Sequence, residues 1–188
     1  MAGLYLASQS PRRTELLTQV GIDHTVVPST YEEPNEGYNN PIEMVKAQAL
    51  GKTRCALGVP AGSIVLGADT IVVLDNEVLG KPHNEFDARR MLERLSGRVH
   101  SVITGVALLI KGEELVFHNE TKVYFKRLAP FEIESYIASG EPMDKAGAYG
   151  IQGKGALWVE KIEGSYTNVV GLPVEHVYDE LCKALGAK

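Results

Sequence analysis

The chain has 188 residues, of which 44% are hydrophobic and 23% are charged, and its formal net charge is −5. This composition is typical of soluble globular proteins, and the length suffices for a hydrophobic core without disulfides. The negative charge disfavours a surface dedicated to coating nucleic acid. We expect a cytoplasmic protein, because there is no secretion signal or membrane-spanning window and both cysteines fall in predicted helices.

The N-terminal residues predict a strand, a tight turn and a helix. Residues 4–7 are short and apolar, as in a strand that opens an α/β unit. Ser10 is the expected N-cap of the following helix, Pro11 fits its first position, and Gly21 fits its end. The turn between the two elements is therefore at the start of a helix.

Polar and basic side chains gather in this turn. Arg12 and Arg13 fall in the first helical turn, where cations are disfavoured unless an anion binds there. With Ser8, Ser10 and the free backbone N–H groups, they predict a phosphate-binding site. The alternative is that both arginines are exposed and have no such role.

A polar segment, residues 31–40, predicts a loop that contains acidic side chains, Glu33 among them. A helix is expected to follow over residues 41–57, with Asn40 and Pro41 at its start. Lys52 interrupts the apolar stripe of this helix. From the pattern alone, a lysine that extends from the packed face towards solvent is the favoured interpretation.

One carboxylate, Asp69, lies within the aliphatic run of residues 64–74, which predicts a strand buried on both faces. A buried charge costs several kcal/mol unless it has a partner or a metal. We interpret Asp69 as a functional carboxylate at the mouth of a cleft; the alternative is a satisfied structural aspartate. A turn at residues 75–77 then returns the chain, which could bring Lys81 near Asp69.

The second half of the chain continues with alternating elements and one glycine-rich segment. We expect helices at 84–95, from 130 to an end at 139–140, and at 174–185, strands at 99–110 and 115–125, and a strand pair between 156–162 and 169–170. The apolar face of the 84–95 helix is expected to include Phe86. Residues 140–155 contain five glycines and predict a loop that is either flexible or shaped for close ligand approach.

Several segments together resemble the Maf family of nucleoside triphosphate pyrophosphatases. They are Leu-Ala-Ser-Gln-Ser-Pro-Arg-Arg (6–13), Gly-Ala-Asp-Thr (67–70), Gly-Lys-Pro (80–82), Leu-Ser-Gly-Arg-Val-His (95–100), Thr-Gly-Val (104–106), Lys-Ala-Gly-Ala-Tyr-Gly-Ile-Gln-Gly (145–153) and Val-Gly-Leu-Pro (170–173). Their order and spacing match the family from residue 4 to about residue 173. The resemblance therefore covers nearly the whole chain.

The resemblance implies cleavage between the α and β phosphates, which gives a monophosphate and pyrophosphate, with a divalent metal such as Mg²⁺ or Mn²⁺. It implies an elongated α/β fold with a mixed central sheet flanked by helices, and two lobes around a deep cleft, similar to the inosine triphosphate pyrophosphatases. We expect residues 1–188 to form one such domain without a separable linker. The resemblance also suggests a homodimer.

The resemblance also implies roles for individual residues. Within the family, the 147–153 segment is similar to that of the branch acting on dTTP and UTP. Asp69 matches the proton acceptor, and the specificity positions match Arg12, Thr70 and Gln152. Further functional positions match Ser8, Arg13, Glu33, Lys52 and Lys81.

Chemistry supports a consistent assignment of these residues. Glu33 and Asp69 suit Mg²⁺, which takes one or two protein carboxylates. The phosphates are expected to contact Ser8, Ser10, Arg12, Arg13, Lys52 and Lys81, whose cations suit a tetra-anionic triphosphate. The amide of Gln152 offers the donor and acceptor needed to recognise a pyrimidine edge.

Two alternatives stay open at this point. One is a nucleotide-binding regulator of septum formation and cell division, a process with which the family is associated. Asp69 would have no obvious purpose in such a binder, and the acidic charge disfavours nucleic acid as a partner. The other is a pyrophosphatase that prefers purine nucleotides or 7-methyl-GTP. The histidines lack metal-ligand spacing, so no zinc site is expected.

Overall fold

A computed structural model describes residues 3–34, 37–38 and 40–186 as a mixed α/β protein. The strands are β1 (Leu4–Leu6), β2 (Thr25–Val26), β3 (Ile64–Leu74), β4 (Glu77–Leu79), β5 (Val99–Ile110), β6 (Glu113–Phe125) and β7 (Val159–Glu163). The helices are α1 (Pro11–Gln19), α2 (Pro41–Arg54), α3 (Glu85–Leu95), α4 (Pro130–Ala138), α5 (Tyr166–Val170) and α6 (Val174–Leu185). Three short 3₁₀ helices are η1 (Glu141–Asp144), η2 (Ala146–Ala148) and η3 (Gly153–Trp158).

One seven-stranded mixed sheet contains all the strands, in the order β2-β1-β3-β5-β6-β7, with β4 paired to β3. β1 pairs in parallel with β2 and β3, whereas β4 and β7 pair antiparallel with β3 and β6. The expected fold class, a mixed sheet flanked by helices, is confirmed. Among the described residues, no helix has both the length and the apolar character needed to cross a membrane.

The chain divides into two compact units. The first comprises the described residues within Met1–Asp69, Thr104–Asn119 and Gly171–Lys188, and the second comprises Thr70–Ile103 and Glu120–Val170. Because β3, β5 and β6 contribute residues to both, neither unit is a continuous segment of sequence. The expected cleft between two lobes stays a prediction, as does the single-domain organisation.

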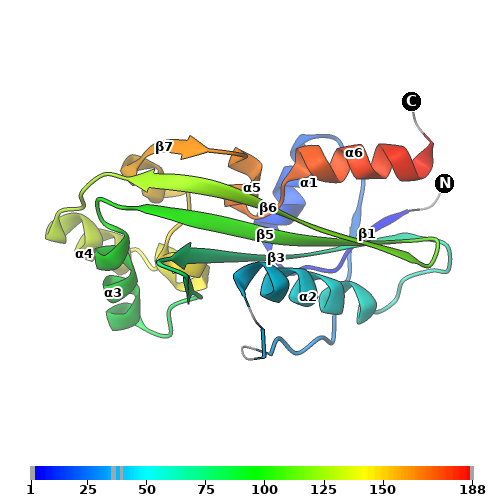
Figure 1. The fold of residues 1–188 in the computed structure, drawn as a ribbon, viewed down its shortest axis with the longest axis horizontal. Helices are drawn as coiled ribbons and strands as arrows, with labels where there is room; N and C mark the ends of the chain where they lie inside the picture. The colour runs from blue at the N-terminus through cyan, green and yellow to red at the C-terminus, as the bar shows by residue number, and fades with distance from the viewer. Residues whose placement is uncertain (1–2, 35–36, 39, 187–188) are drawn as a thin grey trace. The chain divides into compact units, whose positions relative to one another are not determined.

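In the first unit, α2 packs on the sheet at unusually short range. Figure 1 shows α2 on one side of the strands, with α1 and α6 on the other. A Cβ atom added to Gly67 of β3 would lie 2.3 Å from Thr53 Oγ1, and one added to Gly105 of β5 would lie 2.3 Å from the Val45 carbonyl oxygen. Only glycine fits these two positions, so they fix how closely α2 approaches the sheet.

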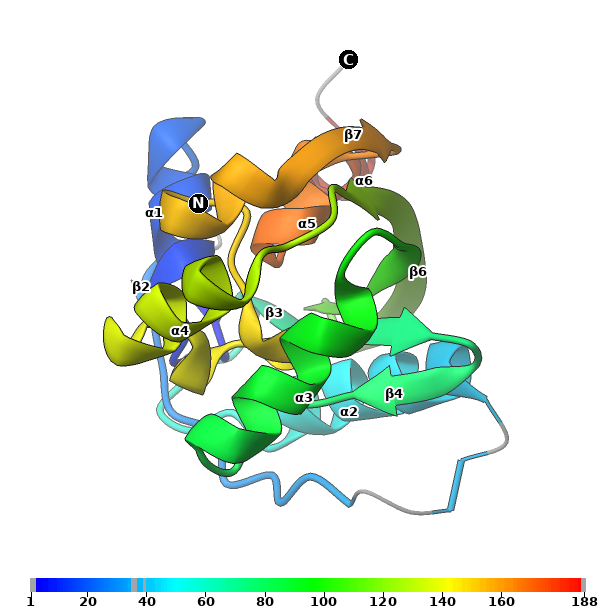
Figure 2. The same cartoon turned by 90° about the vertical axis from the view of Figure 1, so that its left-hand side faces the viewer.

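In the second unit, α3 and α4 lie side by side and pack on an aromatic core (Figure 2). Tyr136 of α4 and Trp158 of η3 meet edge to face, with ring centroids 4.7 Å apart. Both side chains are buried, as are Leu92 and Leu95 of α3. Phe86, which we expected on the packed face of α3, is instead 66% exposed, because the buried face repeats through Ala88, Leu92 and Leu95 and helical periodicity turns Phe86 away from it.

The structure confirms several predicted boundaries and corrects others. The side chains of Asn40 and Asn84 cap α2 and α3, each by accepting the backbone N–H three residues later at 2.9 Å. The expected strand at 169–170 is wrong, because these residues belong to α5. Ser165 starts that helix by accepting the Asn168 N–H at 3.1 Å, and β7 pairs with β6 instead.

The glycine-rich segment is more regular than predicted. Residues 140–155 contain η1, η2 and the beginning of η3, although we expected an irregular loop. Gly140, Gly147 and Gly153 have positive φ angles of 73°, 67° and 76°. Gly140 precedes η1, Gly147 kinks η2 from within, and Gly153 begins η3, so the glycines shape these short helices rather than prevent them.

Candidate active site

The turn between β1 and α1 is held together by a buried arginine. The guanidinium of Arg13 donates from Nη1 to Ser8 Oγ at 2.9 Å and from Nε to the Gly171 carbonyl oxygen at 2.8 Å. Ser8 Oγ also accepts the Ser10 N–H at 3.3 Å. Arg13 is only 8% exposed, so the alternative that both arginines are surface cations is wrong for this residue.

Ser10 occupies the N-cap position of α1, but the cap differs from the prediction. Its side chain makes no capping hydrogen bond, because the Arg13 N–H bonds instead to the Ser10 carbonyl oxygen at 3.2 Å. Pro11 follows at the first helical position, as expected. The Ser10 hydroxyl is thus not needed to cap the helix.

Two carboxylates act on Arg13 through their charge. Burial lowers the pKa of Arg13, and the negative charges of Asp69 and Glu33 oppose that shift, whereas neighbouring Arg12 adds to it. A cation withdrawn from water is tolerated where anions lie near it. The turn after β1 and the acidic residues of the same unit therefore form one electrostatic group.

Lys52 joins the two carboxylates directly. Its Nζ lies 2.7 Å from Asp69 Oδ1 and 2.8 Å from Glu33 Oε1. The side chains of Lys52 and Asp69 are 15% and 11% exposed, and that of Glu33 is 49% exposed. The sequence-based interpretation of Lys52 as a lysine that extends into solvent is wrong, because its ammonium is held between two acids.

This arrangement depends on the close packing of α2. Asp69 lies two residues after Gly67 on β3, and Lys52 precedes Thr53, the residue that Gly67 faces. Thr53 is buried and its hydroxyl donates to the Ala49 carbonyl oxygen at 2.9 Å. The glycine that admits α2 to the sheet therefore also brings the lysine to the carboxylate.

The donor set of this centre fits a divalent metal of the Mg²⁺ type. Glu33 and Asp69 converge on one cationic atom, and Mg²⁺ usually takes one or two protein carboxylates and completes its shell with water and phosphate oxygens. Within residues 3–34, 37–38 and 40–186, no cluster of three or more histidine, cysteine, aspartate or glutamate side chains could hold a metal. The set thus matches a metal that depends on substrate for part of its coordination.

The other predicted site residues belong to the second unit. Val72 of β3 pairs with Leu79 of β4 in an antiparallel register, so the expected hairpin is formed. Lys81 follows β4 by two residues, and its approach to Asp69 stays a prediction. The Gly147 N–H bonds to the Gly80 carbonyl oxygen at 3.0 Å, which attaches the glycine-rich segment to the residue before Lys81.

The predicted site residues thus fall in two sets. The first unit contains Ser8, Ser10, Arg12, Arg13, Glu33, Lys52 and Asp69, and the second contains Thr70, Lys81 and Gln152. Within the first set, contacts join Ser8 to Arg13 and Lys52 to both acids. In the second set, Lys81 is exposed, whereas Thr70 and Gln152 are half-buried.

Sequence reasoning missed residues that surround Glu33. Gln48 is buried on α2 and donates from Nε2 to the Pro34 carbonyl oxygen at 3.1 Å. Tyr31 lies against Gly51, where an added Cβ would meet the ring at 2.2 Å. A glycine inside a helix costs about 0.5–1 kcal/mol relative to alanine, so Gly51 was the signal that could have indicated a close contact.

A buried histidine supports the glycine-rich segment in the second unit. His100 Nε2 and the Tyr149 hydroxyl form a hydrogen bond of 2.7 Å. Burial lowers the pKa of His100 to about 4, so the ring is neutral at physiological pH. In the part of the chain that the structure describes, His100 Nδ1 is buried without a hydrogen-bond partner. The expectation that no histidine forms a zinc site stays a prediction.

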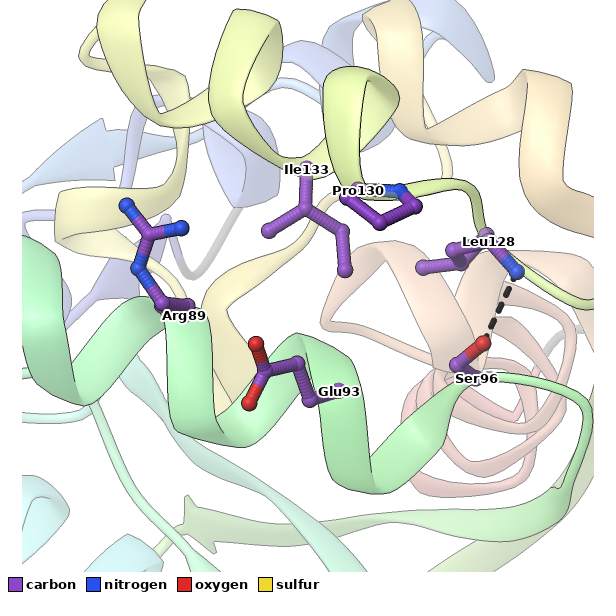
Figure 3. A pocket seen from close by; sticks show the side chains of 6 residues that line it. All are labelled: Arg89, Glu93, Ser96, Leu128, Pro130 and Ile133. Atoms are coloured by element: carbon purple, nitrogen blue, oxygen red, sulfur yellow. Dashed lines mark hydrogen bonds between the residues drawn. The ribbon is translucent and has the colours of Figure 1, made fainter.

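A small pocket between α3 and α4 does not resemble the site (Figure 3). It is lined by Arg89, Glu93, Ser96, Leu128, Pro130 and Ile133. Its arginine forms an ion pair with Glu134, and Ser96 Oγ accepts the Leu128 N–H at 2.8 Å. None of the predicted site residues lines it.

Fold and site together define a class of protein. In a mixed α/β fold, a lysine is paired with two acids, and a buried arginine lies within range of their charges. This combination suits water attack on an anionic substrate. The chain belongs to the Maf family, since the family model described as Maf-like protein matches residues 3–184. The predicted resemblance is therefore confirmed.

Curated relatives match over most of the chain. A protein of Dictyoglomus thermophilum named dTTP/UTP pyrophosphatase is 52% identical over 174 residues, covering 91% of this chain and 90% of that protein. Proteins with the same name from Symbiobacterium thermophilum and Moorella thermoacetica are 52% and 50% identical. The match to the Symbiobacterium thermophilum protein covers 96% of this chain and 93% of that protein. The match to the Moorella thermoacetica protein covers 99% of this chain and 96% of that protein.

Proposed function

We propose that this protein is a metal-dependent pyrophosphatase that hydrolyses dTTP and UTP to the monophosphate and pyrophosphate. The relatives that bear this name align with nearly the whole chain, which supports the activity. The structural observation that carries the proposal is the contact of Lys52 with both Asp69 and Glu33. This contact brings two carboxylates and a cation together, which supports the proposed role of Asp69 as the proton acceptor.

In the proposed reaction, Asp69 accepts a proton from the attacking water. The water oxygen bonds to the α-phosphorus. The bond between the α-phosphorus and the oxygen that bridges the α and β phosphates breaks. The electron pair of that bond leaves with pyrophosphate. A positioned general base contributes about 10²–10⁴-fold to such a step.

Glu33 and Asp69 would hold the divalent metal. When bound, the metal supplies positive charge that neutralises phosphate oxygens and orients the triphosphate. Lys52, Arg12 and Arg13 add fixed cations beside it. We propose that Ser8 and Ser10 donate hydrogen bonds to phosphate oxygens from the turn that Arg13 holds in place.

Substrate choice is assigned to Arg12, Thr70 and Gln152, and Lys81 is assigned to the phosphates. The Gln152 amide offers one donor and one acceptor, which suits the O4 and N3–H edge shared by uracil and thymine. Cytosine presents the opposite pattern at these atoms. A site of this kind therefore discriminates by hydrogen bonding rather than by size.

A panel of triphosphates tests the proposal. Purified protein is incubated with dTTP, UTP, CTP, ATP, GTP and 7-methyl-GTP in Mg²⁺ or Mn²⁺, and the monophosphate and pyrophosphate are quantified. We expect dTTP and UTP to be the preferred substrates. We expect Asp69→Asn to lower kcat by about 10²–10⁴-fold while nucleotide binding is retained.

The alternatives predict different results in the same panel. If no nucleotide yields pyrophosphate and Asp69→Asn behaves like the parent, the protein is a nucleotide-binding regulator rather than an enzyme. A preference for 7-methyl-GTP or for purines would contradict the role given to Gln152. Activity that is unchanged by chelation of divalent metal would contradict the role given to Glu33.

We propose, further, that the protein acts as a homodimer in the cytoplasm. The support is the family resemblance for the dimer, and for the compartment it is the two cysteines, which are free in the structure as suits a reducing environment. Light scattering after size-exclusion chromatography measures the mass directly. A mass of one chain at the concentrations used for assay would contradict the dimer.

A further inference from the structure

One face of α2 contacts the acidic loop on both sides of Glu33. Gln48, Gly51 and Lys52 are three and four residues apart, so they lie on the same side of the helix. Lys52 binds the Glu33 carboxylate at 2.8 Å, and Gln48 donates to the carbonyl oxygen of the next residue, Pro34, at 3.1 Å. The helix thus holds both the side chain of Glu33 and the backbone after it.

Gly51 makes room for an aromatic ring before Glu33. A Cβ atom at this position would lie 2.2 Å from Tyr31 Cε2 and 2.3 Å from Tyr31 Cζ, so the ring occupies the space that any other residue would fill. Glycine is a poor helix former, and this contact gives a reason for its presence inside α2. The backbone at Tyr31 is fixed as well, because its N–H donates to Ser29 Oγ at 3.3 Å, while that hydroxyl donates to the Lys52 carbonyl oxygen at 2.9 Å.

The hydroxyl end of Tyr31 feels the charges of the site. The pKa of Tyr31 is raised to about 12, first by burial and then by a hydrogen bond with Tyr38 and by the negative charges of Glu33 and Asp69. The side chain therefore lies within range of the charges of the two carboxylates, and its ring packs against the helix at Gly51. It connects the loop to α2 next to the reacting centre.

We propose that Tyr31 and Gln48 are positioning residues that hold Glu33 beside Lys52 and Asp69, with Gly51 as the opening that admits the tyrosine ring. The inference rests on the proposed function, because it assigns Glu33 a role towards the metal. Glu33 is half exposed and lies outside any helix or strand, so without these contacts its backbone and side chain would sample many conformations. Residues that orient a metal ligand typically change metal affinity or activity about 10–100-fold when they are replaced.

Gly51→Ala is the central test. The added methyl group must displace the Tyr31 ring, so we expect the Mn²⁺ concentration for half-maximal activity to rise about tenfold. In the protein without metal or nucleotide, we expect faster hydrogen–deuterium exchange in residues 29–34. The melting temperature should fall little, because alanine favours the helix and offsets the lost contact.

Further variants separate positioning from general stability. Tyr31→Ala removes the ring and should resemble Gly51→Ala in its Mn²⁺ dependence. The variant that combines Gly51→Ala with Tyr31→Ala should need no more Mn²⁺ for half-maximal activity than Tyr31→Ala alone, because the two single changes remove the same contact. Gln48→Ala should also raise the Mn²⁺ concentration for half-maximal activity. Gln19→Ala, at an exposed position of α1, serves as its control.

Glu33→Gln distinguishes this inference from the proposed function. If Glu33→Gln leaves the Mn²⁺ dependence unchanged, the metal role of Glu33 is wrong, and exchange in residues 29–34 still decides whether Tyr31 and Gly51 hold the loop. Suppose instead that Glu33→Gln raises the Mn²⁺ concentration for half-maximal activity, whereas Gly51→Ala and Tyr31→Ala change neither that concentration nor the exchange in residues 29–34. The positioning role proposed for Tyr31 is then wrong. A fall in melting temperature with faster exchange throughout the chain would also overturn it, since the contact would then serve only the fold.

Discussion

The ammonium of Lys52 lies 2.7 Å from the carboxylate of Asp69, and the same nitrogen lies 2.8 Å from Glu33. One cation thus compensates two acids that come from a loop and from the middle of a strand. Without that cation, two like charges would face each other in a poorly hydrated setting, which is unfavourable. A divalent metal has the charge to take over this function.

Lys52→Met therefore predicts a stability that depends on metal. We expect a loss of about 2 kcal/mol in the free energy of unfolding, below the usual cost of breaking a buried pair because Glu33 is half exposed. Mg²⁺ or Mn²⁺ should then raise the melting temperature of the variant more than that of the parent, because the metal replaces the missing charge. The melting temperature is measured with and without metal.

The matched control is Lys183→Met, which removes an exposed lysine from its ion pair with Glu180 on α6. Its melting temperature should respond to metal as the parent's does. If Lys52→Met gains no more from metal than this control, Glu33 and Asp69 do not form a cation site of the proposed kind.

Arg13→Lys predicts that charge alone cannot replace the guanidinium. Lysine keeps the positive charge but cannot donate simultaneously to Ser8 Oγ and to the Gly171 carbonyl oxygen in the geometry that Arg13 uses. Loss of a buried hydrogen bond costs about 1–3 kcal/mol, so we expect the free energy of unfolding, measured by urea denaturation, to decrease by about 2 kcal/mol. Arg54→Lys, at an exposed pair with Glu114, should change it by less than about 1 kcal/mol. Equal effects of the two substitutions would contradict a structural role for Arg13.

The parts of the fold that could be predicted are those with local causes. Asn40 and Asn84 cap their helices through contacts only three residues long, and the sequence carries that information directly. Asp69 was identified because a lone carboxylate in an aliphatic strand requires a partner. Residues 169–170 were misassigned because two adjacent valines resemble a strand, whereas the start of their helix depends on Ser165.

The partner of Lys52 could not be predicted, because it depends on packing between distant segments. Gly67 and Gly105 set the distance between α2 and the sheet, and that distance decides whether the ammonium reaches Asp69 or solvent. The residues next to either glycine in the sequence do not indicate how closely α2 packs on the sheet. Tyr31 was missed for the same reason, since its contact is with a glycine twenty positions later.

Gly105→Ala tests the control of α2 by the sheet. The added Cβ would lie 2.3 Å from the Val45 carbonyl oxygen, and backbone cannot move aside as a side chain can. Overpacking of this kind costs about 1–3 kcal/mol, and we expect a loss in that range together with lower activity, because α2 carries Lys52. Gly80→Ala meets open space and should keep its stability. Parent-like stability and activity of Gly105→Ala would contradict the close packing.

His100 predicts a particular pH dependence of stability. Its pKa in the folded state is about 4, lowered by burial from the ordinary 6.5 that we assign to the unfolded chain. Above about pH 6.5 the ring is neutral in both states, and its contribution to stability is fully present. As the pH falls from 6.5 to 4, only the unfolded state gains the proton, so the free energy of unfolding should decline by up to about 3 kcal/mol.

His100→Gln isolates this effect, because glutamine does not titrate and can still bond to the Tyr149 hydroxyl. Carboxylates also titrate near pH 4, so the informative quantity is the difference between the urea-unfolding free energies of variant and parent at each pH. That difference should shift in favour of the variant between pH 7 and pH 4. His83→Gln, at an exposed position, should leave the pH profile of the parent unchanged. Parallel profiles for His100→Gln and the parent over this range would show that the histidine takes up its proton equally in the folded and unfolded chains.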